Sequence, residues 1–94
     1  MNLTSCVKGE SSEGRPGWII QFPYDAEFIE EFKHMIDHRH REWRPDRKEW
    51  WVDELYENEL DQLFKNWYAL AKLHRMRDKQ DRNARLVAFA DAHP

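Results

Sequence analysis

Apolar and polar positions alternate in a short run near the start of the chain, and this run predicts a β-strand. Residues 18–22 are mostly β-branched or aromatic, follow a Pro-Gly pair and stop at Pro23, so turn-forming residues bound both ends. Side chains alternate along a strand, so Trp18, Ile20 and Phe22 share one face. This face is expected to form one wall of a hydrophobic core.

The spacing of apolar residues then changes to that of an amphipathic helix over residues 25–38. Asp25 is a candidate N-cap, because its carboxylate can accept hydrogen bonds from the free backbone N–H groups of the first turn. The apolar positions form one stripe that can cover the strand, and they are Phe28, Ile29, Phe32, Met35 and Ile36.

Residues 41–52 predict a β-hairpin. Two aromatic stretches flank Pro45-Asp46, and proline pre-sets the backbone angle of the first corner of a type I turn. We expect Trp43 and Trp50 to lie in the core. Trp51 then points to the opposite sheet face, where it either packs under a second helix or is exposed.

A long second helix is predicted from residue 53 to about residue 75, because neither Gly nor Pro occurs between Asp53 and the final residue. Its apolar positions follow helical spacing and are Tyr56, Leu60, Leu63, Phe64, Trp67, Leu70 and Ala71. Residues 76–94 are expected to be a helical extension or a partly disordered tail. Residues 1–17, rich in loop formers, are expected to be a flexible leader.

These segments together predict an α+β fold of the order β-α-β-β-α, with a short sheet, one packed helix, a hairpin and a long C-terminal helix. A chain of 94 residues supports one thin-cored domain, and its five Trp, five Phe and three Tyr residues compensate for the few core positions.

One cysteine, Cys6, cannot form an intramolecular disulfide, so we expect a reducing, cytoplasmic location. No apolar run is long enough to predict export or a membrane span.

Charge is segregated along the chain although the net charge is only −3. Residues 10–31 carry one Arg against six acids, and residues 32–52 carry six bases against four acids. Residues 53–61 carry five acids and no base, whereas residues 62–85 carry seven bases against two acids. Any nucleic-acid binding must therefore use a local basic patch.

Residues 18 to 70 resemble a known family in the sequences Ile20-Gln21-Phe22-Pro23-Tyr24-Asp25, Phe32-Lys33, Trp43 and Asp46-Arg47-Lys48-Glu49-Trp50-Trp51-Val52. This pattern is similar to the HARP domain, the substrate-recognition module beside the motor of annealing helicases. The resemblance implies contact with DNA forks or strand junctions. The chain carries no Gly-x-x-x-x-Gly-Lys-Ser/Thr phosphate loop, so a free-standing module of this kind would act as an accessory or regulatory factor.

Cations and aromatic rings alternate in the hairpin, and single-stranded nucleic acid favours this combination because bases stack on rings while cations hold phosphates. A second basic stretch, over residues 65–85, could track a phosphate backbone. It forms one continuous patch with the hairpin if the second helix crosses the sheet. The candidate nucleic-acid-binding residues are Arg41, Arg44, Arg47, Lys48, Trp51, Lys65, Lys72 and Arg75. The alternative is that these charges form ordinary solvated surfaces.

Metal binding and catalysis have little sequence support. His34 and His38 lie four residues apart with His40 nearby, but no fourth ligand is close, so we expect neither a metal site nor a cofactor. The Ser and Thr hydroxyls all lie within residues 1–17, and Cys6 has no base near it in sequence. We expect a protein that is not an enzyme.

Two functions fit these patterns. The first is a nucleic-acid-recognition module for DNA forks or single strands, with the hairpin as the contact surface. The second is a small protein-binding regulator, of the kind that phages and mobile elements encode, whose acidic zones bind or inhibit a host protein.

Overall fold

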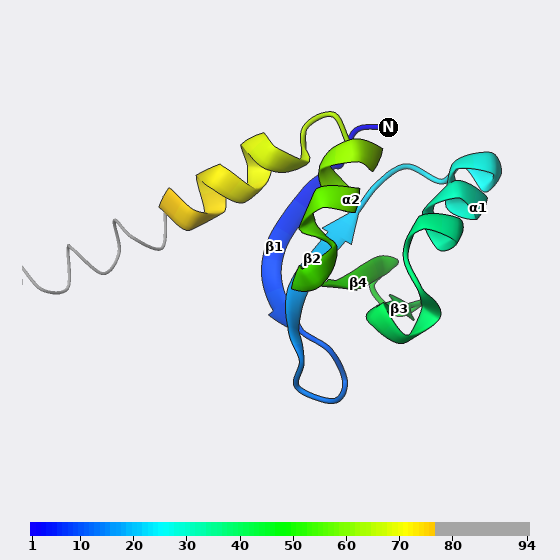
Figure 1. Ribbon diagram of the computed structural model, residues 1–94, viewed down its shortest axis with the longest axis horizontal. Helices are drawn as coiled ribbons and strands as arrows, with labels where there is room; N and C mark the ends of the chain where they lie inside the picture. Colours follow the sequence, from blue (N-terminus) through cyan, green and yellow to red (C-terminus); the bar gives the residue numbers. More distant parts are fainter. Residues whose placement is uncertain (77–94) are drawn as a thin grey trace, which may run out of the picture.

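The computed structural model describes residues 1–76 and shows a small α+β domain in which helices pack on an antiparallel sheet of four strands (Figure 1). The predicted fold class is confirmed. Its elements are β1 (Ser5–Glu10), β2 (Pro16–Gln21), α1 (Ala26–Met35), the 3-10 turn η1 (His38–His40), β3 (Arg41–Arg44), β4 (Glu49–Asp53), the 3-10 turn η2 (Glu54–Tyr56) and α2 (Glu57–Leu63), followed by a helical segment over residues 67–76.

The strands lie in the order β1-β2-β4-β3, so β1 and β3 form the two edges of the sheet. All neighbouring pairs are antiparallel, with Ile19 opposite Trp51 and Trp43 opposite Trp50. Side chains alternate along each strand, so Trp18 and Trp50 belong to one face of the sheet and Trp51 belongs to the other.

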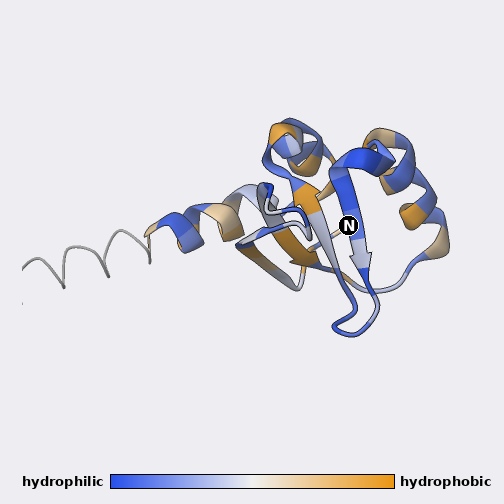
Figure 2. Cartoon of the chain, turned by 90° about the horizontal axis from the view of Figure 1, so that it is seen from below, coloured by the Kyte–Doolittle hydropathy of each residue, from blue (hydrophilic) through white to orange (hydrophobic). Residues whose placement is uncertain are grey.

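The helices bury their apolar stripes against the first of these faces. Figure 2 shows apolar stretches in the central strands and alternating apolar and polar turns in the helices. Phe32 of α1 packs against Trp50 at 5.0 Å between ring centroids, and Trp67 packs edge-on against Trp18 at 5.7 Å. The buried cluster comprises Leu3, Cys6, Trp18, Ile20, Phe32, Ile36, Trp50, Val52, Leu60, Leu63, Phe64, Trp67 and Ala71.

The N-terminal segment is not the flexible leader that its composition suggests. Residues Ser5–Glu10 form the edge strand β1 and pair along their whole length with β2. Backbone hydrogen bonds, which composition does not reveal, hold this strand in place. Its glycine also has a packing role, because a Cβ at Gly9 would collide with the side chain of Ile19.

The expected long second helix is interrupted, which corrects a further prediction. α2 ends at Leu63, and Phe64 adopts an extended conformation (φ −119°, ψ 119°) before helix resumes at residue 67. The break is stabilised by the N-terminus: the Leu3 N–H donates to Asn66 Oδ1 (2.7 Å), and Asn66 Nδ2 donates to the Leu3 carbonyl (2.9 Å). These tertiary bonds outweigh the helical propensity of the segment.

The helical extension or partly disordered tail predicted for residues 76–94 lies, apart from Met76, outside the described residues. Within residues 1–76, no helix is both long and apolar enough to cross a bilayer.

Candidate nucleic-acid interface

Two adjoining hollows of about 520 and 550 Å³ lie between α1 and the β3–β4 hairpin. Both are lined by Tyr24, Ile29, Trp43 and Trp50. The loop after β2 supplies Tyr24, helix α1 supplies Ile29, and the hairpin supplies the two indoles. We call these two hollows the α1–hairpin groove.

Trp43 is the exposed aromatic ring of this groove, and the prediction that it belongs to the core is wrong. Its side of edge strand β3 is only partly covered, so 48% of the residue remains exposed. Its indole packs against Trp50, with ring centroids 5.1 Å apart and planes tilted by 46°. Trp50 is only 8% exposed, as predicted for a core residue. The packing therefore holds Trp43 in place while leaving surface free for a second aromatic partner.

Tyr24 is more exposed still, at 84%, and lines both hollows. Together with Trp43 it gives the groove two accessible aromatic side chains. Planar rings of this kind can stack on nucleobases in a sequence-tolerant way.

Cations surround this aromatic surface. Lys33 and Arg41 line one hollow and Lys48 lines the other. Arg41 Nε donates to the carbonyl of Ile36 (2.9 Å), and its guanidinium carbon lies 6.0 Å from the centre of the Trp50 ring. This fixes the position of one positive charge at the groove, whereas the two lysine side chains are exposed.

Lys48 occupies a special backbone position at the end of the hairpin turn. Its φ of 51° is left-handed, a conformation that few residues other than Gly and Asn adopt readily. The turn places its side chain beside Pro45 and Trp43 at the groove.

The two remaining hairpin cations differ in how far they are engaged by other groups. Arg44 donates to the Glu10 carbonyl (2.5 Å), and its guanidinium lies 3.8 Å from carboxylate oxygens of both Glu42 and Glu49. Arg47 is exposed at the tip, where it lines a further hollow of about 740 Å³ together with Trp43. The structure therefore leaves Arg47 more accessible to phosphate than Arg44.

Trp51 is buried, with an exposed fraction of 1%, and it lies neither at the surface nor under the second helix. It belongs to the sheet face opposite the helices, where its indole covers Gly17 and the Arg15 guanidinium carbon lies 5.8 Å from its ring centre. The alternative in which Trp51 is an exposed stacking residue is therefore wrong.

The second basic stretch lies at the other edge of the sheet. Lys65, Lys72 and Arg75 belong to the C-terminal part of the described chain, which contacts β1, whereas the hairpin contains the opposite edge strand β3 (Figure 1). Arg75 is already paired with Glu57 (2.9 Å). Within residues 1–76 the two basic zones therefore do not merge into the continuous patch considered above.

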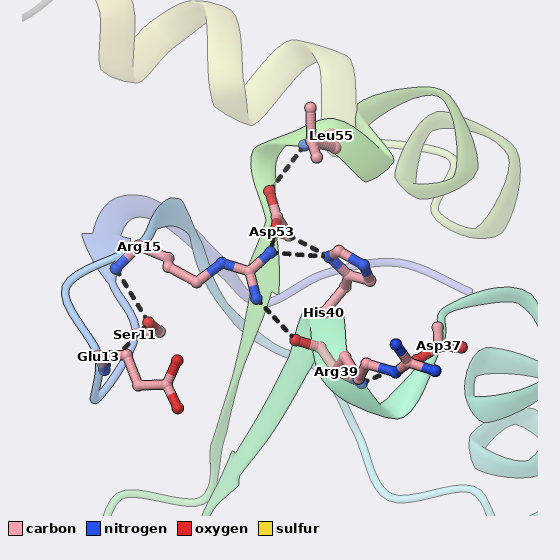
Figure 3. A network of polar contacts seen from close by, with 8 residues as sticks. All are labelled: Ser11, Glu13, Arg15, Asp37, Arg39, His40, Asp53 and Leu55. Atoms are coloured by element: carbon pink, nitrogen blue, oxygen red, sulfur yellow. Dashed lines mark hydrogen bonds and ion pairs between the residues drawn. The ribbon is translucent and has the colours of Figure 1, made fainter.

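A polar cluster joins the ends of three segments on the sheet face that carries Trp51 (Figure 3). Arg15 and His40 both contact the carboxylate of Asp53, with His40 Nδ1 at 2.9 Å from Oδ2. The same His40 nitrogen lies 3.0 Å from Arg15 Nη2, so it donates to Asp53 in one ring tautomer and accepts from Arg15 in the other. The Leu55 N–H donates to the other carboxylate oxygen (3.1 Å).

These contacts keep Asp53 ionised despite its burial. Burial alone would raise the pKa of Asp53, but the hydrogen bonds from His40 and Leu55 and the nearby Arg15 charge outweigh it, so the pKa lies below its usual value. The cluster is a structural link between the β1–β2 loop, η1 and the end of β4.

The groups considered for metal binding and catalysis do not assemble in residues 1–76. No group of three or more His, Cys, Asp or Glu side chains there could hold a metal ion. His40 is engaged with Asp53, and Ser12 Oγ donates to Glu42 (2.7 Å). Burial raises the pKa of the Cys6 thiol to about 12, although the Arg75 and Lys8 charges oppose this, so the reactive thiolate is scarce at neutral pH.

Sequence reasoning missed four residues that line the groove with polar or exposed aromatic side chains: Tyr24, Glu30, Lys33 and Trp43, the last of which it assigned to the core. The Phe-x-Tyr-Asp and Phe-Lys segments contain two of them, but nothing local showed that α1 and the hairpin would face each other across a hollow. Comparison of the chain with protein-family models, curated proteins and solved structures finds no match.

Proposed function

We propose that this chain is a non-enzymatic nucleic-acid-recognition module that binds single strands, including those exposed at DNA forks, through the α1–hairpin groove. The observation that carries the proposal is Trp43, a half-exposed indole held against Trp50. Its apolar surroundings suit a base, and the cations beside it suit the phosphates on either side of that base.

The groove favours an unpaired strand over a duplex. Trp43 stands beside both hollows of the groove, so a chain of nucleotides can lie along the groove across its ring. In a duplex the flat faces of the bases are already stacked on one another, so they are not free to stack on Trp43. A motor domain acting on forks would gain from an accessory factor that holds the displaced strand.

The acidic zone at residues 53–61 gives the protein-binding alternative less support. In the segment 53–61, Asp53 is buried in the polar cluster, Glu54 pairs with Lys8 (3.1 Å) and Glu57 pairs with Arg75 (2.9 Å). Much of this negative charge is therefore balanced within the molecule and does not form a free acidic surface.

The proposal is tested by fluorescence anisotropy with labelled single-stranded, forked and duplex DNA at about 50 and 200 mM salt. We expect the single-stranded and forked DNA to bind more tightly than the duplex, with affinity falling as salt rises. The double variant Lys33→Gln, Lys48→Asn removes two groove charges, and asparagine tolerates the left-handed backbone of position 48. The slope of log affinity against log salt should become shallower by about 1.4, or 0.7 per lost contact.

The matched control is the double variant Lys65→Gln, Lys72→Gln, which removes the same charge from the far edge of the sheet. It should leave both the affinity and the salt slope unchanged if the groove is the binding surface. Equal effects of the two double variants would show that only net charge matters, and a lack of binding at low salt would refute the proposal.

A further inference from the structure

Among residues 1–76, Glu30 is the one acidic residue that lines the α1–hairpin groove. It stands on α1 between Ile29 and Lys33 and faces the hollow that Arg41 and Trp43 also line. The residue is exposed, and its carboxylate has no ion pair within the described part of the chain. A binding surface for a polyanion that includes a free carboxylate needs an explanation.

Electrostatics restricts what this carboxylate can contact in a bound strand. Phosphates are repelled by Glu30 and attracted by the neighbouring Lys33 and Arg41. A base stacked on Trp43 would instead turn its hydrogen-bonding edge toward the walls of the hollow. The carboxylate is then an acceptor facing base atoms, and it contributes selectivity where the cations contribute affinity.

The chemistry of the bases determines which one this acceptor favours. A carboxylate has two oxygens and no donor, so it fits an edge that carries two adjacent N–H groups. The Watson–Crick edge of unpaired guanine has this arrangement, with N1–H beside the N2 amino group. Thymine has a single N3–H between two carbonyl oxygens, and these repel a carboxylate.

Resting on the proposed function, we infer that Glu30 makes the groove selective for an unpaired guanine over thymine. The ligand class is therefore a single strand with an exposed guanine, stacked on Trp43 and paired with the Glu30 carboxylate through its N1–H and N2–H groups. Two such hydrogen bonds to a charged acceptor are the strong kind.

The test compares short thymidine oligonucleotides that differ only in one central base, either guanine or thymine, by fluorescence anisotropy at about 50 mM salt. We expect about tenfold tighter binding of the guanine oligonucleotide by the natural chain, within the range for one good base contact. Glu30→Gln replaces one acceptor oxygen by a donor, so the preference should fall to about twofold or less. Its affinity for the thymine oligonucleotide should rise slightly, because a repulsive charge is lost.

Glu31→Gln is the matched control, since it makes the same change of charge one position along α1 at a residue that does not line the groove. It should keep the guanine preference. Equal binding of the two oligonucleotides by the natural chain, or a preference that survives Glu30→Gln, would overturn the inference while leaving the proposed function standing. If neither oligonucleotide binds, the proposed function fails as well.

Discussion

Replacing Trp43 with alanine removes the aromatic surface on which the proposed function depends. Loss of one base–aromatic stack costs about 1–3 kcal/mol of binding free energy, so the dissociation constant for a single strand should rise about 5- to 150-fold. The same change should have little effect on binding to a duplex, whose bases are already stacked. Trp43→Phe keeps a smaller ring and should lose less affinity than the alanine variant.

The cost of this substitution to stability can be worked out from the exposure of the side chain. Trp43 is 48% exposed, so about half of its surface, on the order of 100 Å², is removed from water. At about 25 cal/mol per Å² this corresponds to about 2.5 kcal/mol of unfolding free energy, as an upper bound. A domain of ordinary stability stays almost entirely folded after such a loss.

The assay therefore pairs fluorescence anisotropy with urea unfolding followed by circular dichroism. Trp51→Phe serves as the control, because it trims a buried ring on the opposite sheet face and should lower stability by about 1–3 kcal/mol without changing affinity. An affinity for single strands that is unchanged in Trp43→Ala would refute stacking on this ring. A parallel loss of affinity in Trp51→Phe would instead attribute the effect to destabilisation.

Three further predictions concern the scaffold. Gly17→Ala should lower the unfolding free energy by about 1–3 kcal/mol in urea melts, because the new Cβ would lie 2.5 Å from Trp51 Nε1 and closer still to the Val52 carbonyl; unchanged stability would contradict this packing. The pKa of Asp53 is lowered in the folded chain, so the ionised carboxylate stabilises the fold above about pH 4, and this stabilisation is lost as the pH falls further. Asp53→Asn should therefore lower the unfolding free energy by about 2 kcal/mol at pH 7, and denaturant melts should show this difference shrinking below pH 4. Because burial raises the pKa of Cys6 to about 12, its thiol should react with a disulfide reagent far more slowly at pH 8 in the folded chain than in urea, and equal rates would show that the N-terminal strand is open.

Local sequence pattern predicted the elements whose hydrogen bonds and contacts are short-range. The strand ending near Phe22, the helix capped by Asp25 and the hairpin around Pro45-Asp46 all occur, because proline, a capping carboxylate and regular apolar spacing act within a few residues. The fold class followed from their order along the chain.

Pairing between segments decided the rest. Ser5–Glu10 became a strand because β2 offers an edge to pair with, and the second helix broke because Asn66 bonds to Leu3. The Leu3–Asn66 pairing joins residues 63 positions apart and so leaves no mark on the local pattern. The β1–β2 pairing is a hairpin across residues 11–15, and the loop-rich composition of residues 1–17 hid its first strand.

The three tryptophans of the hairpin show the same division most clearly. Alternation along β4 correctly placed Trp50 and Trp51 on opposite faces, since that depends only on strand geometry. It could not tell which rings would be covered, because burial depends on what packs over each face. Tertiary structure put Trp51 beneath Arg15 and left Trp43 open at the edge beside α1, and so moved the expected stacking surface from one to the other.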